Sequence, residues 1–206
     1  THGVGIFLIV IPASGLLNDL FAGLQQIDLS LPLPLNGSGD SLEGIQIRDG
    51  KEIYRNVAVN EICVSRGNSG GMIEVSVSVN KLPMSRQRAD GLIVSTPTGS
   101  TAYALSVGGP MIYPSVACTL LIPVAPHSLA NRPIVIPENS LIEITVTDMR
   151  DATLYFDMQD NSEVLVGDII KASPYPHRVK ILHPSRHNYF DTLCKKLHWN
   201  YLPTDR

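Results

Sequence analysis

Asp90-Gly-Leu-Ile-Val-Ser-Thr-Pro-Thr-Gly-Ser-Thr-Ala-Tyr103 is a segment in which a strand pattern passes into a turn rich in hydroxyl side chains. Leu92 to Ser95 are apolar or small, which predicts a short buried strand, and Pro97 prevents further strand pairing. The glycine that follows lets the backbone turn and a ligand approach, while backbone N–H groups and hydroxyls suit phosphate oxygens. The segment therefore predicts a strand-to-helix turn that could bind phosphate, although Ser- and Thr-rich turns also occur without a ligand.

Strand patterns continue on both sides of this segment. Apolar and polar residues alternate from Met72 to Val79 and again from Ile142 to Val146, which is the period of a half-buried strand. Asp49-Gly50 predicts a hairpin turn between two further strands. Other short strands are expected around Leu154, Val164, Ile169 and Val179. Many short strands and few helices predict a mainly β fold, similar to a β-sandwich.

The chain is expected to divide into three parts. Residues 1–35 would hold a buried strand, a short helix and a linker, residues 36–182 the β-rich domain, and residues 183–206 a carboxyl-terminal segment. In that last segment Asn188 is placed to cap a helix. Phe190, Leu193 and Leu197 fall on one face of this helix, which would pack back on the protein.

Charge, cysteine content and hydropathy argue against several classes of protein. Lys and Arg total 16 against 19 Asp and Glu, so the clustered positive charge of a nucleic-acid-binding protein is not expected. Cys63, Cys118 and Cys194 are far apart and odd in number, which argues against disulfides and a zinc site and fits a reducing, cytoplasmic location. No apolar run approaches the roughly 18 residues of a membrane span, so no membrane partner is expected.

Two short motifs point to functions that the rest of the sequence does not support. Gly67-Asn-Ser-Gly-Gly71 resembles the nucleophile loop of trypsin-like serine proteases, but that chemistry needs an upstream histidine base, and His2 is too close in sequence. A glycine-rich hairpin is the better interpretation. Gly3-Val-Gly5 fails as a dinucleotide fingerprint because Leu8 stands where the third glycine is required.

The opening segment continues to Gly108-Gly109-Pro110 and resembles the central motif of the NAD kinases. Other stretches resemble that family in the expected order, namely Asn60-Glu61, Pro126-His-Ser-Leu-Ala-Asn-Arg-Pro133, Asp157-Met-Gln159, and the run from His183 to Trp199. The resemblance covers about residues 45–200, whereas residues 1–44 match poorly. It implies the carboxyl-terminal portion of a bacterial-type NAD kinase, with residues 1–35 as a remnant of an α/β domain and residues 36–182 as the dinucleotide-binding domain.

The resemblance also implies which residues bind NAD. Asn60 and Glu61 would contact the adenosine half, and Asp90 the ribose or amide on the nicotinamide side. Thr98, Gly99 and Ser100 would lie toward the phosphates. The remaining implied contacts are Gly71, which replaces a larger residue of the family, and Arg88, Thr101, Ala102, Tyr103, Ala104, Leu105, Ser106 and Gln159. From the residues alone, other roles stay open. These are a solvated turn at Asn60-Glu61, a backbone-binding Asp90, a surface Arg88 and a core role for Ala104 and Leu105.

The implied activity is phosphoryl transfer to the 2′-hydroxyl of the adenosine ribose of NAD, giving NADP. The donor would be ATP or polyphosphate with a divalent ion such as Mg²⁺, no residue is assigned as a metal ligand, and a homodimer or homotetramer is expected. The family carries its expected base in a Gly-Gly-Asp-Gly motif that these 206 residues do not contain, so the catalytic residue is unassigned. The chain alone is therefore expected to be nearly inactive. A noncatalytic NAD(P)-binding module and, more remotely, a lipid kinase of the related superfamily are the alternatives.

Overall fold

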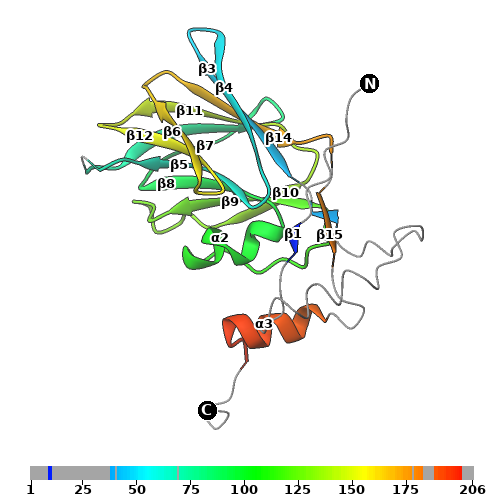
Figure 1. The fold of residues 1–206 in the computed structure, drawn as a ribbon. Helices are drawn as coiled ribbons and strands as arrows, with labels where there is room; N and C mark the ends of the chain where they lie inside the picture. Colours follow the sequence, from blue (N-terminus) through cyan, green and yellow to red (C-terminus); the bar gives the residue numbers. More distant parts are fainter. Residues whose placement is uncertain are drawn as a thin grey trace, which may run out of the picture. The chain divides into compact units, whose positions relative to one another are not determined.

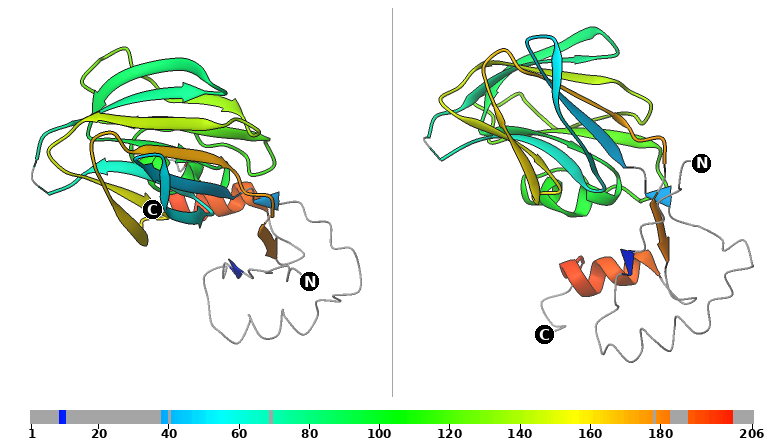
Figure 2. Two further views of the ribbon diagram at one scale, coloured as in Figure 1. Left: turned by 90° about the horizontal axis from the view of Figure 1, so that it is seen from above. Right: turned by 45° about the horizontal axis from the view of Figure 1, so that its top comes forward.

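Two six-stranded antiparallel sheets stack face to face (Figure 1, Figure 2). The computed structural model describes residues 9–10, 38–39, 41–68, 70–177, 179–182 and 188–200. The first sheet has the order β4 (Lys51–Ala58), β3 (Leu42–Arg48), β14 (Ile169–Pro174), β11 (Ile142–Asp148), β6 (Ile73–Val79) and β7 (Leu82–Ala89). The second has the order β10 (Ile134–Pro137), β9 (Cys118–Val124), β8 (Gly91–Ser95), β5 (Glu61–Arg66), β12 (Ala152–Phe156) and β13 (Asp160–Val164). The mainly β, sandwich-like fold expected from the sequence is confirmed.

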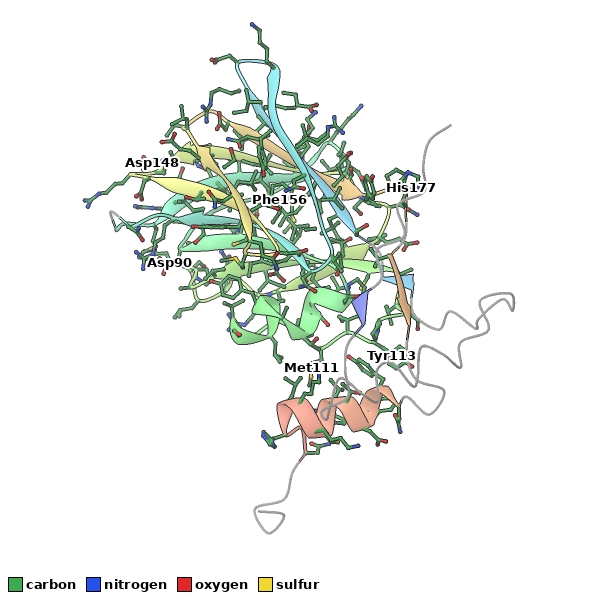
Figure 3. All side chains as sticks on the ribbon, viewed as in Figure 1. Asp90, Met111, Tyr113, Asp148, Phe156 and His177 are labelled. Atoms are coloured by element: carbon green, nitrogen blue, oxygen red, sulfur yellow. The ribbon has the colours of Figure 1, made fainter. Side chains whose placement is uncertain are left out.

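The core between the sheets is built from the alternating residues of their strands. Ile73 and Val75 of β6 and Ile142 and Ile144 of β11 are at most 1% exposed, as the period of two predicted. Phe156 of β12 lies between the two sheets (Figure 3). Each such buried aliphatic or aromatic side chain contributes about 1.5–3 kcal/mol to folding. The alternation thus predicted the buried faces of β6 and β11.

The predicted hairpin and the predicted strand-to-helix turn are both present. Asp49 and Gly50 connect β3 to β4 with positive φ angles of 52° and 75°, the conformation that an Asp-Gly turn favours. After β8, residues Thr98–Thr101 form the 3₁₀-helix η1, and Tyr103–Ser106 form the short helix α2. Local sequence was sufficient to predict both features because turn residues act through their own backbone preferences.

The described residues belong to two units. In the first unit, which holds both large sheets, Val179 and Lys180 of β15 (Val179–Leu182) also pair with β2 (Ser38–Gly39). In the second unit, the end of β15 pairs in parallel with β1 (Ile9–Val10). The expected limits at residues 35 and 182 stay predictions. Of the strand expected before Pro12, only Ile9 and Val10 are described, as β1. The helix expected after Ser14 and the pair His183-Pro lie outside the described residues.

The second unit also contains helix α3 (Tyr189–Leu197). Asn188 caps it as predicted, because its side chain accepts a hydrogen bond from the backbone N–H of Phe190 at 3.0 Å. Of the three apolar residues expected on the packed face, only Leu193 is buried, whereas Phe190 and Leu197 are exposed. In the part of the chain that the structure describes, no helix is both long and apolar enough to cross a membrane.

Candidate functional site

The candidate site lies on the outer face of the second sheet, which we define as the face turned away from the first sheet. Ile62 and Val64 of β5 point into the sandwich core, so the alternate residues Glu61, Cys63 and Ser65 belong to the outer face. Helix α2 packs on this face through a cluster of apolar residues. The buried members of this cluster are Cys63, Ile93, Ala104, Cys118, Leu120 and Ile122, and Tyr103 packs against them. Strand and helix thus bring residues 61–65 and residues 98–106 to one surface.

The Asp157 side chain stabilises the corner between β4 and β5, which comprises residues 59–61. Its carboxylate accepts hydrogen bonds from the backbone N–H groups of Val59 at 2.8 Å, Asn60 at 2.7 Å and Glu61 at 3.0 Å. Thr96, just after β8, donates from Oγ1 to the Val59 carbonyl at 2.7 Å. The Asn60–Glu61 corner is therefore held by residues that are distant in sequence. Sequence reasoning quoted Asp157 only for its resemblance to the family motif and gave it no role.

Gly99 allows the turn after β8 to approach this corner closely. A Cβ atom at position 99 would lie 2.7 Å from the Cα of Asn60 and still closer to its carbonyl, where no side chain fits. The backbone N–H of Gly99 donates to Thr96 Oγ1 at 3.0 Å. The sequence attributed this glycine to a turn of the backbone and to the approach of a ligand, and the structure adds the close approach of Asn60.

Glu61 is a buried carboxyl group in this corner. It is 3% exposed, and its Oε2 atom has no hydrogen-bond partner among the described residues. Burial, followed by the nearby charge of Asp157, raises the pKa of Glu61 to about 7. A buried acceptor without a partner is unfavourable in the free protein, and ligand hydroxyl groups could supply the missing hydrogen bonds.

A polar cavity of about 340 Å³ lies at the other end of β5. Its lining residues are Ser65, Arg66, Gly67, Asn68, Asp90, Tyr103 and Val124. Arg66 Nε contacts Asp90 Oδ1 at 3.0 Å, and both side chains are partly exposed (Figure 3 shows Asp90). Burial raises the pKa of Tyr103, with smaller contributions from Cys63, Asp90 and Glu61. The cavity thus offers a carboxylate, a guanidinium and an aromatic ring to a polar ligand.

The turn between β8 and α2 uses most of its polar groups within the protein. Ser100 is fully buried, and its hydroxyl donates to the Pro97 carbonyl at 2.6 Å and accepts from the backbone N–H of Ile112 at 3.0 Å. The backbone N–H groups of Ser100 and Ala102 donate to carbonyls of the same turn. Thr98 differs, because its Oγ1 is buried without a hydrogen-bond partner among the described residues. Thr98 is therefore the member of the predicted phosphate-side turn with an unused polar group.

The other residues predicted to contact NAD differ in their burial. Ala104 is fully buried in the apolar cluster, and Thr101, Ala102 and Leu105 are half-buried beside it. Ser106, Gln159, Gly71 and Arg88 are exposed and are not among the residues that line the cavity. Arg88 lies on the first sheet, paired in register with Glu74. Arg66 and Asn68, which do line the cavity, were not predicted, because the sequence indicated only a glycine-rich hairpin there.

A model of the ATP-NAD kinase C-terminal domain family matches residues 59–183. The NAD kinase of Ralstonia nicotianae is 49% identical over 164 residues, which cover 80% of this chain and 54% of that protein. The NAD kinase of Cupriavidus pinatubonensis is 44% identical over 187 residues, which cover 88% of this chain and 61% of that protein. The chain therefore spans little more than half the length of these curated relatives.

Two solved structures share the fold. Yeast NADH kinase complexed with NADH superimposes with a TM-score of 0.75 at 26% identity, covering 79% of this chain and 50% of the yeast chain. An NAD kinase from Archaeoglobus fulgidus in complex with ATP superimposes with a TM-score of 0.64 at 28% identity, covering 77% of this chain and 59% of the archaeal chain. Both likenesses agree with the two-sheet architecture described above.

Proposed function

Because this chain belongs to the ATP-NAD kinase family, we propose that it binds NAD on the outer face of the second sheet and serves the synthesis of NADP. In that reaction the 2′-hydroxyl of the adenosine ribose attacks the terminal phosphoryl group of a donor. The observation that carries the proposal is the buried Glu61 carboxyl, whose Oε2 lacks a partner among the described residues. It lies within the matched residues and on the same face as the cavity that contains Asp90.

The two ends of β5 suit the two halves of a dinucleotide. Glu61 and Ser65 are four residues apart, which corresponds to about 13 Å along a strand. We assign the adenosine half to Asn60 and Glu61, and the nicotinamide half to the cavity with Asp90 and Tyr103. Thr98 directly precedes Gly99, which approaches Asn60, and it offers an unused hydroxyl. Phosphoryl transfer depends mainly on such positioning, so the role of this chain is to hold and orient the acceptor nucleotide.

ATP is the donor that we favour over polyphosphate, because the archaeal relative was solved in complex with ATP. The family implies a divalent ion, but the part of the chain that the structure describes contains no group of three or more His, Cys, Asp or Glu residues that could hold one. These residues therefore do not fit a protein-held metal site. We assign no base either, since the Gly-Gly-Asp-Gly motif is not found in this sequence.

Self-association as a homodimer or homotetramer, and location in the cytoplasm, are further parts of the proposal. Exposed apolar side chains on the outermost strands β7 and β10 support self-association, namely Leu82, Met84, Ile134 and Val135. Light scattering coupled to gel filtration would measure the mass of the assembly. A monomer at every concentration tested would contradict this part.

Binding of NAD or NADP by the purified 206-residue chain is the direct test of the proposed function. Calorimetry should show saturable binding, because the proposed contacts between Asn60 and Gln159 all lie in this chain. Nicotinamide mononucleotide, which lacks the adenosine half, should bind more weakly and serves as the control ligand. The absence of both a heat signal and a thermal shift at millimolar NAD and NADP would contradict the proposal.

Asp90→Asn should weaken NAD binding about ten- to hundredfold, since a charge-assisted hydrogen bond contributes roughly 1.5–3 kcal/mol. The change keeps the size of the side chain but removes the charge and places an NH₂ donor opposite Arg66. Asp148→Asn is the matched control, because Asp148 is exposed on the first sheet (Figure 3). A lower melting temperature with unchanged affinity would instead make Asp90 a purely structural residue.

A further inference from the structure

A negatively charged group, the Asp157 carboxylate, faces Glu61 from the turn after β12. Cys63 on β5 and Tyr103 on α2 also lie near Glu61, but burial raises the pKa of both, so each is neutral at neutral pH. Asp90 stands at the other end of the site, where Arg66 already pairs with it at 3.0 Å. No cation among the described residues is paired with Glu61. A carboxylate at Glu61 therefore has to form beside Asp157 without a protein counter-ion, which is unfavourable in a buried position.

Asp157 cannot relieve this repulsion by moving away. Its two carboxylate oxygens accept three backbone N–H groups, from Val59, Asn60 and Glu61, at 2.7–3.0 Å. The backbone bonds therefore keep Asp157 in place next to Glu61.

We infer that the carboxyl group of Glu61 releases a proton to solvent when a ligand with hydroxyl donors binds in this corner. Asp157 is a positioning residue for Glu61. The inference rests on the proposed binding of NAD. In the free protein Glu61 holds its proton over part of the neutral range. When ribose hydroxyls donate to its oxygens, the carboxylate gains the partners that it lacks, and the O–H bond of the acid breaks as the proton passes to water. After burial, the charge of Asp157 increases the fraction of the site that is protonated before binding.

The pKa of Glu61 determines what fraction of the free protein carries this proton. Burial, and after it the charge of Asp157, raises the pKa of Glu61 to about 7. The free site is then mostly protonated at pH 6 and mostly ionised at pH 8. Because the ligand prefers the carboxylate, the affinity should rise with pH and reach a plateau above neutrality.

The first measurement compares NAD affinity at pH 6 and pH 8 by calorimetry. NAD is the probe because its phosphodiester groups do not titrate in this range. The unmutated chain should bind about tenfold more tightly at pH 8, and at pH 7 it should release about half a proton per NAD bound, measured in two buffers of different ionisation enthalpy. Glu61→Gln should bind equally at both pH values and release no proton.

The second measurement distinguishes positioning from a structural role of Asp157. Asp157→Asn removes the charge, so the affinity ratio between pH 8 and pH 6 should fall to about two- to fourfold. Asp157→Glu keeps the charge and should retain the larger ratio. If Asp157 were only structural, Asp157→Asn would weaken binding equally at both pH values and leave the ratio unchanged, which would overturn its assignment.

The outcomes separate this inference from the proposed function. NAD binding with equal affinity at pH 6 and pH 8 and without proton release would overturn the inference alone. Absence of NAD binding at both pH values would overturn the proposed function, and the inference with it. Melting temperatures show whether each variant is folded. If neither variant of Asp157 folds, the proton count of the unmutated chain against Glu61→Gln still decides whether Glu61 releases the proton.

Discussion

Gly99→Ala should reduce NAD binding by at least about a hundredfold, equivalent to roughly 2.7 kcal/mol. The added methyl group would meet the Cα of Asn60 at 2.7 Å and the carbonyl of Asn60 even closer, and all of these are backbone atoms. The Asn60 backbone cannot yield, because Asp157 and Thr96 hold it through hydrogen bonds. The turn that contains Thr98 must therefore move away from the corner that contains Glu61.

Gly99→Ala should lower the NAD affinity mainly by displacing the turn in the site, and it should lower the stability of the fold less. Overpacking of this kind costs about 1–3 kcal/mol of stability, so the variant should remain folded at 25 °C. Gly108→Ala is the matched control in the same segment. Gly108 has a φ of 85° and no atom within 4 Å of the added Cβ, so the substitution strains the backbone without a collision. Calorimetry of both variants tests the prediction, and wild-type affinity of Gly99→Ala would refute the close approach.

Local sequence predicted those features that depend on local preferences. The hairpin at Asp49-Gly50, the strands β6 and β11, and the turn after β8 follow from turn chemistry and from the period of two. The cap at Asn188 follows from a side chain that reaches its own helix. These elements were predictable because their determinants lie within a few residues of one another.

The supports of the candidate site were not predictable in the same way. Asp157 fastens Glu61 from a distance of 96 residues in the chain, and Arg66 meets Asp90 only because β5 and β8 pair in one register. Neither contact leaves a periodic signal in the sequence. Resemblance to a family pointed to Asp90 and Glu61, but it did not show what holds them. Met158 shows the same limit, since its φ of 55°, unusual for a residue other than glycine, was not indicated by the sequence.

Asp168→Ala should destabilise the folded chain by about 2–4 kcal/mol, the largest stability change that we expect from a single charged residue. Asp168 is 1% exposed and its carboxylate accepts hydrogen bonds from Arg48 at 2.8 and 2.9 Å, from Gln46 at 2.7 Å and from the Leu165 backbone at 2.9 Å. Alanine would leave the amide of Gln46 and part of the Arg48 guanidinium without this acceptor. Because Arg48 is 29% exposed and water can reach it, the estimate stays below the full cost for a buried charge.

The stabilising contribution of Asp168 should decrease as the pH falls. Burial alone would raise the pKa of Asp168, but the hydrogen bonds from Arg48, the Leu165 backbone and Gln46 outweigh it and hold the pKa below its usual range. A carboxyl group with a lowered folded-state pKa stabilises the protein above the unfolded value of about 3.9 and loses this contribution as the pH falls through the folded value. Urea unfolding should therefore show the full difference between Asp168→Ala and the unmutated chain at pH 7 and a smaller one below about pH 4. Glu52→Gln, in the exposed pair with Arg55, should change stability little, and an equal loss in both variants would contradict the assignment of Asp168 as a buried anchor of the first sheet.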